Sequence, residues 1–170
     1  MTLLDEYMPI YDIGKRHATI VDAPPVAVFA QVRKMDISGS AIIRVLFALR
    51  GLGRRFSFGD FEDMGFVLLG ERVDDELLLG LVGRVWSLAG GIRRVNAAEF
   101  HAFDEPGYAR ATWNFKVSPR EDGTLLETET RVQCTDEVAR RKFMRYWRFV
   151  GPCSGLVRLE ILRGIKKSLV

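Results

Sequence analysis

Cysteine and histidine are scarce in this chain of 170 residues, which contains two of each. Cys134 and Cys153 do not form a CxxC pair, and His17 and His101 each stand alone. Zinc sites usually show close pairs of such ligands, and disulfide frameworks need more cysteines. The sequence therefore predicts free thiols, no metal site and no cofactor.

Long apolar runs are also missing. No run reaches the roughly 18 residues that a membrane span requires. The first residues, Met1 to Glu6, have neither the basic region nor the apolar region of a secretion signal. We expect a cytoplasmic protein without stable membrane insertion.

A strong excess of one charge is absent as well. Lys and Arg total 25 against 22 Asp and Glu, which gives a net charge of +3. Arginine pairs such as Arg93-Arg94 and Arg140-Arg141 are scattered among acids, whereas phosphate-binding surfaces cluster their positive charge. We expect solvated faces and no nucleic-acid partner.

Apolar residues are sufficient for one core, since 48% of the chain is hydrophobic and 11% is aromatic. A chain of this length can bury roughly 70% of its unfolded surface without disulfides or metals. The sequence predicts a single domain over residues 1–170.

The first third of the chain predicts a strand followed by two helices. Residues 14–22 end in β-branched residues and read as a strand, which Ala23-Pro24-Pro25 terminates. A short helix is expected over residues 24–35, because proline is tolerated in a first helical turn. A second, largely apolar helix is expected over residues 40–50, and residues 54–65 have no assignable period.

The middle of the chain reads as an antiparallel meander of strands separated by turn-forming residues. The predicted strands cover residues 66–73, 77–86, 92–103, 108–117 and 125–134. The last two alternate cleanly between apolar and polar residues, which predicts a sheet with one covered face and one wet face.

The last predicted strand can be placed in two registers. Thr128, Thr130 and Val132 are expected on the covered face, which leaves Glu127, Glu129 and Arg131 outside, where cross-strand pairing with Arg110 or Lys116 would explain them. A one-residue slip would instead turn two acids and a base into the interior.

A long amphipathic helix is predicted from about Asp136 to the end of the sequence. Asp136 is a good N-cap, and Phe143, Trp147 and Val150 recur at helical spacing. Gly151-Pro152 should kink this helix, because an internal proline removes a hydrogen bond and clashes with the preceding turn.

This order of elements resembles a known family. Residues 21–29, VDAPPVAVF, are similar to the strand-to-helix opening "v-x-A-P-x-x-x-V-F" of the START and polyketide-cyclase-like superfamily, also called SRPBCC or helix-grip. The last strand running into a long helix is similar too. The resemblance covers nearly the whole chain and implies one START-like domain of the α+β class. Its helix-grip fold would be a curved antiparallel sheet of about six strands wrapped around the long C-terminal helix, with two short helices after the first strand.

The resemblance also implies a deep, largely apolar cavity between sheet and helix for lipids, sterols or aromatic polyketides. The residues expected to line it lie on the covered face and on the apolar stripe of the helix. They are Trp113, Phe115, Thr128, Thr130, Val132, Phe143, Trp147 and Val150. A filled core would use the same apolar residues, and the two threonines could equally bond within the sheet.

No residue is assigned a catalytic role. His17 is placed beside no nucleophile, and a lone histidine is a nonspecific signal. Gly151-Pro152-Cys153-Ser154-Gly155 has the spacing of a nucleophile elbow but lies in a predicted helix rather than a strand-to-helix turn. Gly51-Leu52-Gly53 follows a predicted helix and lacks the third glycine of a dinucleotide loop.

Three functions remain open. The sequence favours a non-enzymatic carrier or sensor of a hydrophobic small molecule, because the expected lining has few titratable groups. A polyketide cyclase or aromatase-like enzyme is the first alternative and requires a base inside the cavity. A filled-core protein-interaction module is the second. Ligand identity, pathway and oligomeric state cannot be deduced from the sequence.

Overall fold

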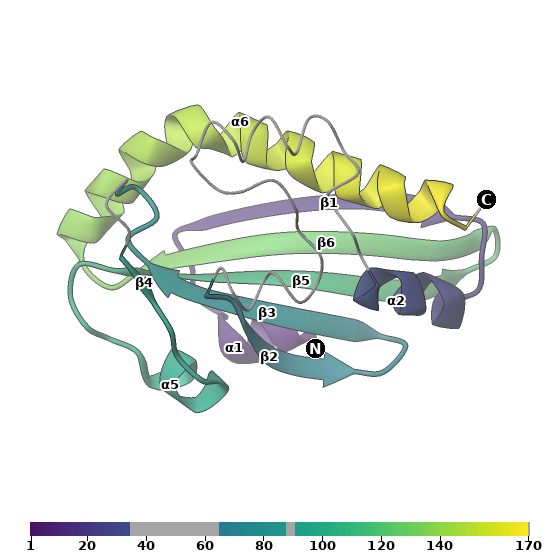
Figure 1. The fold of residues 1–170 in the computed structure, drawn as a ribbon, viewed down its shortest axis with the longest axis horizontal. Coiled ribbons are helices and arrows are strands. Elements are labelled where there is room, and N and C mark those ends of the chain that lie inside the picture. Colours follow the sequence, from purple (N-terminus) through teal and green to yellow (C-terminus); the bar gives the residue numbers. More distant parts are fainter. Residues whose placement is uncertain (35–64, 88–90, 170) are drawn as a thin grey trace.

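The computed structural model describes residues 1–34, 65–87 and 91–169 (Figure 1). Its elements follow one another along the chain as a mixture of short helices, strands and one long helix. They are α1 (Leu3–Tyr7), β1 (Ile13–Val21), α2 (Pro25–Arg33), β2 (Val67–Arg72), β3 (Glu76–Gly83), β4 (Ile92–Arg93), α5 (Ala97–Ala102), β5 (Ala109–Arg120), β6 (Gly123–Cys134) and α6 (Glu137–Lys167).

The described strands form a six-stranded antiparallel sheet in the order β1-β6-β5-β3-β2, with β4 paired to β3. β5 and β6 form a hairpin in which Trp113 lies opposite Thr130 and Phe115 opposite Thr128. β1 completes the other side of β6, with His17 opposite Thr128. The predicted α+β class, antiparallel sheet and long closing helix are confirmed.

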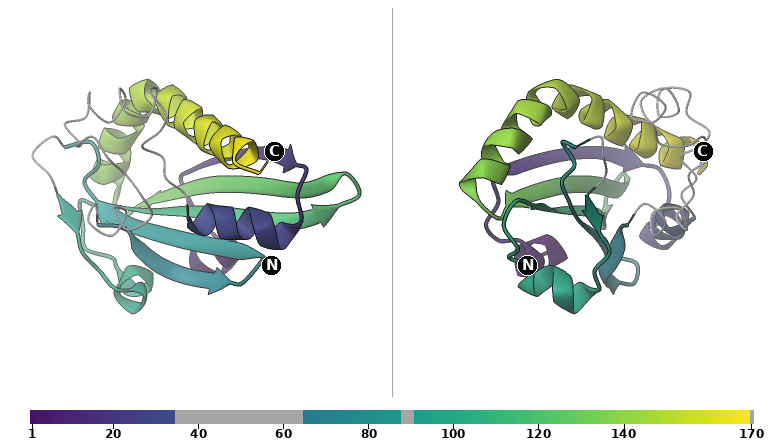
Figure 2. Two further views of the ribbon diagram at one scale, coloured as in Figure 1. Left: turned by 45° about the vertical axis from the view of Figure 1, so that its right-hand side comes forward. Right: turned by 60° about the vertical axis from the view of Figure 1, so that its left-hand side comes forward.

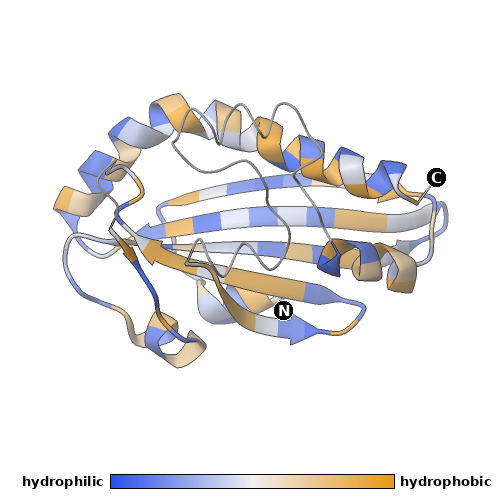
Figure 3. Ribbon diagram, viewed as in Figure 1, coloured by the Kyte–Doolittle hydropathy of each residue, from blue (hydrophilic) through white to orange (hydrophobic). Residues whose placement is uncertain are grey.

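The inner face of the sheet, which faces α6, carries the main core. Phe115 and Leu126 are fully buried there and pack with Val21, Phe29 of α2 and Leu162 of α6. Figure 3 shows why the elements meet in this way, since apolar residues dominate β3 and recur along α6 between polar ones. The helix predicted over residues 24–35 is confirmed as α2, whereas residues 40–50 lie outside the described residues.

The prediction of a wet second face is wrong. α1 and α5 lie on the side of the sheet opposite α6 (Figures 1 and 2). Leu4 and Met8, in and just after α1, and Phe100 of α5 form a second core there with Leu78 and Val82 of β3. These short helices cover apolar β3 residues that alternation alone leaves on the solvent side.

The strand predicted over residues 92–103 is also wrong. Only Ile92–Arg93 pair with the sheet, and the chain then forms α5. Asn96 explains the change, because its side chain accepts a hydrogen bond from the Glu99 N–H while the Glu99 carboxylate accepts one from the Asn96 N–H. This capping box starts a helix in which Phe100 is buried.

α6 begins where predicted, with the Asp136 side chain accepting a hydrogen bond from the Ala139 N–H. The helix continues through Pro152 and bends over the sheet, as Figures 1 and 2 show. None of the helices in the described ranges has the length and apolar character needed to cross a membrane.

Candidate functional site

A pocket of about 390 Å³ lies between β1, at the edge of the sheet, and the middle of α6. Two residues of β1 and six of α6 form its walls. They are Lys15, His17, Trp147, Gly151, Pro152, Gly155, Leu156 and Leu159. The pocket therefore sits where the long helix bends over the first strand.

The helix side of the pocket lacks side chains at two positions. A Cβ added at Gly155 would lie 3.6 Å from His17 Nε2, and one added at Gly151 would lie 3.1 Å from the Trp147 indole. Pro152 lies between them and cannot donate a helical hydrogen bond. The glycines leave open the space between α6 and β1.

Trp147 forms one wall. Its ring stacks on Phe143, one turn earlier, with ring centroids 5.6 Å apart and an interplanar angle of 26°. Phe143 is fully buried and also meets Trp86 edge-on. One part of Trp147 therefore belongs to the core, and another part lines the pocket.

The strand side of the pocket is polar. Lys15 and His17 lie on the inner face of β1, opposite Thr130 and Thr128 of β6. His17 Nδ1 is buried without a hydrogen-bond partner among the described residues. Burial lowers the pKa of His17, and the positive charges of Arg158 and Lys15 lower it further.

Arg158 reaches the same region from α6. It is 4% exposed, and its Nε donates a 3.1 Å hydrogen bond to the Thr130 hydroxyl. Its Nη1 is buried and has no partner within the described part of the chain. Burial lowers the pKa of Arg158 to about 10, so the side chain still carries its charge at neutral pH.

The eight predicted lining residues are distributed between this pocket and the surrounding core. Trp147 lines the pocket, whereas Phe115, Val132 and Phe143 are buried in the core clusters, and Val150 is half-buried outside the pocket lining. Their contact with a ligand stays a prediction.

The two predicted threonines have different partners. The Thr128 hydroxyl accepts a 2.7 Å hydrogen bond from Trp113 Nε1 and donates one of 2.7 Å to the Asn114 carbonyl, so it bonds within the sheet. Thr130 instead accepts its hydrogen bond from Arg158 of α6.

Sequence reasoning missed Lys15, Arg158 and the two pocket glycines as site residues. One signal was available, because Arg158 follows Gly151 and Gly155 on the stripe of α6 that begins with Trp147. A charged residue on an otherwise inward-facing stripe is unusual and marks a special environment.

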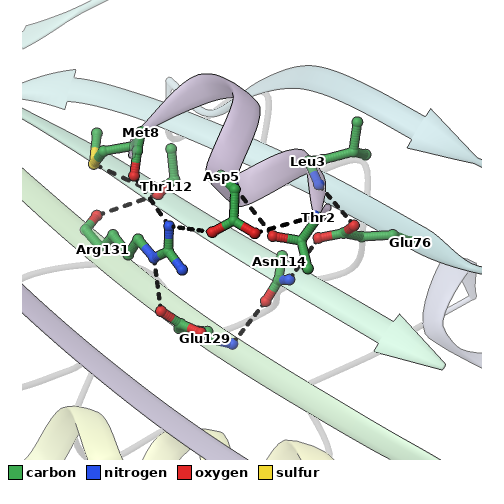
Figure 4. A network of polar contacts seen from close by, with 9 residues as sticks. All are labelled: Thr2, Leu3, Asp5, Met8, Glu76, Thr112, Asn114, Glu129 and Arg131. Carbon is green, nitrogen blue, oxygen red and sulfur yellow. Dashed lines mark hydrogen bonds and ion pairs between the residues drawn. The ribbon is translucent and has the colours of Figure 1, made fainter. Parts of the chain in front are cut away.

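The outer face of β6 has the predicted orientation but not the predicted partners. Glu129 accepts a hydrogen bond from Arg131, and Arg131 also pairs with Asp5 of α1 at 3.0 Å (Figure 4). Glu127 pairs with Arg16 of β1. The register with acids inside is therefore excluded, and the expected pairing of these residues with Arg110 or Lys116 is wrong.

Lys116 pairs with Asp75, and Arg110 bonds Gln133. In the described ranges, no three His, Cys, Asp or Glu side chains gather closely enough to hold a metal ion. Cys134 and Cys153 are free thiols, and burial together with the nearby Asp12 raises the pKa of Cys134 to about 12.

No protein-family model and no curated protein matches this chain. Solved structures with a similar course of the chain include a protein from Chromobacterium violaceum, which is 9% identical over 92% of this chain and 96% of its own, with a TM-score of 0.41. An uncharacterized protein from Rhizobium leguminosarum is 8% identical over 91% and 95%, with a TM-score of 0.39.

The di-domain ARO/CYC StfQ from the steffimycin biosynthetic pathway is 11% identical, with 96% of this chain and 54% of StfQ covered and a TM-score of 0.37. Similarity at this level assigns neither a ligand nor a reaction to this chain.

Proposed function

We propose that this protein binds a small, mainly apolar molecule in the pocket between β1 and α6. The observation that carries the proposal is the gathering of Gly151, Pro152 and Gly155 at the pocket, in the middle of a 31-residue helix. Inside a helix, glycine costs about 1 kcal/mol and proline about 3 kcal/mol relative to alanine. A helix that only closed a core would be more stable without them, whereas a binding site needs the space and the bend.

The walls suit an apolar ligand. Trp147, Leu156 and Leu159 line the pocket, and Leu156 is half exposed. Apolar walls with a few convergent polar groups are typical of small-molecule sites, whose volumes range from about 300 to 1,000 Å³. The pocket also argues against the filled-core interaction module.

The resemblance of residues 21–29 to the START and polyketide-cyclase-like superfamily supports the same proposal. We place the whole chain there as one domain, with lipids, sterols and aromatic polyketides as the ligand classes that the resemblance implies. Binding without chemistry is the function we favour.

A cyclase or aromatase-like activity is the second candidate, and His17 is the observation that favours it. Its imidazole lines the pocket, and its lowered pKa keeps it neutral at pH 7, which is the form that accepts a proton. If the protein cyclises a bound linear polyketone, His17→Gln should keep binding and lose conversion.

The binding proposal is tested by filling the pocket. Gly155→Leu places a side chain against His17, whereas Gly164→Leu is a matched control, because Gly164 is exposed and a Cβ added there meets no described atom within 4 Å. Calorimetric titration with decanoic acid, cholesterol and emodin compares both variants with the parent.

We expect the parent to bind at least one of these compounds. Gly155→Leu should weaken that binding by about 10-fold or more, since a leucine occupies volume that the ligand needs, while Gly164→Leu should bind like the parent. Absence of binding by the parent, or equal binding by both variants, would overturn the proposal.

A further inference from the structure

Arg158 is a buried cation that pairs with no carboxylate in the described part of the chain. Its side chain bonds the neutral Thr130 hydroxyl through Nε, while Nη1 has no partner among the described residues. A guanidinium taken out of water costs several kcal/mol unless an anion and further hydrogen bonds compensate it. Within residues 1–34, 65–87 and 91–169, this positive charge beside the pocket is therefore uncompensated.

The charges around Arg158 do not supply that anion. The inner faces of β1, β5 and β6 carry no Asp or Glu in the described structure, while Lys15 adds a second positive charge. The carboxylate nearest to Arg158 in sequence, Glu160 of α6, is already paired with Arg163.

Arg158 lies next to the proposed ligand site. Gly155, one helical turn earlier, lines the pocket directly opposite His17. Thr130, which holds Arg158, is the register partner of Lys15 in the pocket wall. The positive charge of Arg158 helps to lower the pKa of His17, and the buried His17 Nδ1 is a second polar atom that has no partner among the residues the structure describes.

We propose that the molecule bound in this pocket is an apolar acid, whose carboxylate is held by Arg158 with Lys15 and His17 beside it. The inference rests on the proposed binding function and adds the chemical class of the ligand. The carboxylate would accept a hydrogen bond from Nη1 of the guanidinium, which is stronger than a hydrogen bond between neutral groups. The apolar part would lie against Trp147 and Leu159.

The test compares acids with neutral molecules of the same shape. Decanoate and decanol form one pair of probes, and 1-naphthoate and 1-naphthalenemethanol form another. Each is titrated into the parent, Arg158→Met and Arg163→Met. Arg163→Met is the matched control, because this substitution removes the same charge from an exposed position of the same helix.

We expect the parent to bind the acid of at least one pair about 10-fold or more tightly than the alcohol, as a hydrogen bond to a charged group implies. Arg158→Met should abolish this preference while keeping alcohol binding, and Arg163→Met should retain it. Without ligand, the thermal midpoint of Arg158→Met should equal or exceed that of the parent, because an uncompensated buried charge has been removed.

Equal binding of acid and alcohol by the parent would overturn the acid proposal and leave the pocket proposal standing, and this comparison needs no variant to fold. Binding of neither would overturn both. A lower midpoint for Arg158→Met with an unchanged acid preference would show that Arg158 only stabilises the fold.

Discussion

The backbone N–H of Leu3 donates a 2.8 Å hydrogen bond to the buried carboxylate of Glu76 (Figure 4). This contact joins α1 to the first residue of β3, on the face of the sheet opposite the pocket. The other Glu76 oxygen accepts a 2.7 Å hydrogen bond from the Asn114 side chain. Both carboxylate oxygens are therefore occupied by donors from different elements.

Glu76→Gln should destabilise the protein. A glutamine amide has one acceptor oxygen, so its NH₂ group would face either the Leu3 N–H or the Asn114 NH₂ and leave a buried donor unpaired. We expect a loss of about 1–3 kcal/mol in the free energy of unfolding, measured by urea denaturation. Glu121→Gln in the exposed turn before β6 is the control, and an equal effect there would contradict the assignment.

Asp5 should make the same helix sensitive to acid. Hydrogen bonding with Thr2 and the adjacent Arg131 guanidinium lower the pKa of Asp5 from 3.8 to about 2. A carboxylate whose pKa is lowered by folding stabilises the folded state at pH values above its pKa in the unfolded chain. For Asp5 this stabilisation is lost as the pH falls from 3.8 through about 2.

Asp5→Asn should therefore flatten the dependence of the thermal midpoint on pH between about 4 and 2, and lower the midpoint at pH 7. Asp122→Asn, in an exposed turn, is the control and should keep the parent's profile. A parent-like acid profile in Asp5→Asn would show that Asp5 does not couple α1 to the sheet.

The parts of the fold that alternation or helical spacing specifies were predictable. The burial of β6 largely follows a period of two, and α6 has an N-cap and a recurring apolar stripe, so these elements identify their own buried face. β5 alternates in sequence, but Thr112 and Asn114 on its polar side are buried as well. α1 and α5 were missed because each is at most six residues long and is specified by a capping box rather than by a period.

The site was less predictable than the fold. Periodicity identifies Trp147 and Phe143 as facing inward, but it does not say which of them borders empty space. That depends on Gly151 and Gly155, whose missing side chains matter only once β1 is known to lie opposite. Arg158 is polar by sequence, and its burial depends on the packing of α6 against β6, where it bonds Thr130.

His17 should also make stability depend on pH, in a higher window. Burial, followed by the charges of Arg158 and Lys15, lowers the pKa of His17 below its ordinary value of 6.5. The unfolded chain therefore binds a proton at a pH where the folded chain does not. The free energy of unfolding should be highest above pH 6.5 and fall as the pH decreases through 6.5 toward the folded pKa.

His17→Gln should remove this decrease, as thermal midpoints between pH 5 and 7.5 would show. His101→Gln is the control, because His101 is exposed on α5. If both variants keep the parent's slope in this range, burial of the His17 imidazole does not govern the pH dependence.

The substitution Trp147→Leu tests whether Trp147 acts as a wall of the pocket or as part of a packed core. Truncating a fully packed tryptophan costs about 3–5 kcal/mol, but Trp147 is only half-buried and borders the pocket on one side. We expect a smaller loss of unfolding free energy, and a loss of about 10-fold or more in affinity for whichever of decanoic acid, cholesterol and emodin the parent binds. Trp86→Leu is the matched control, since Trp86 contacts the same Phe143 ring outside the pocket lining and should reduce stability without changing affinity. Parent-like affinity in Trp147→Leu would remove Trp147 from the binding site.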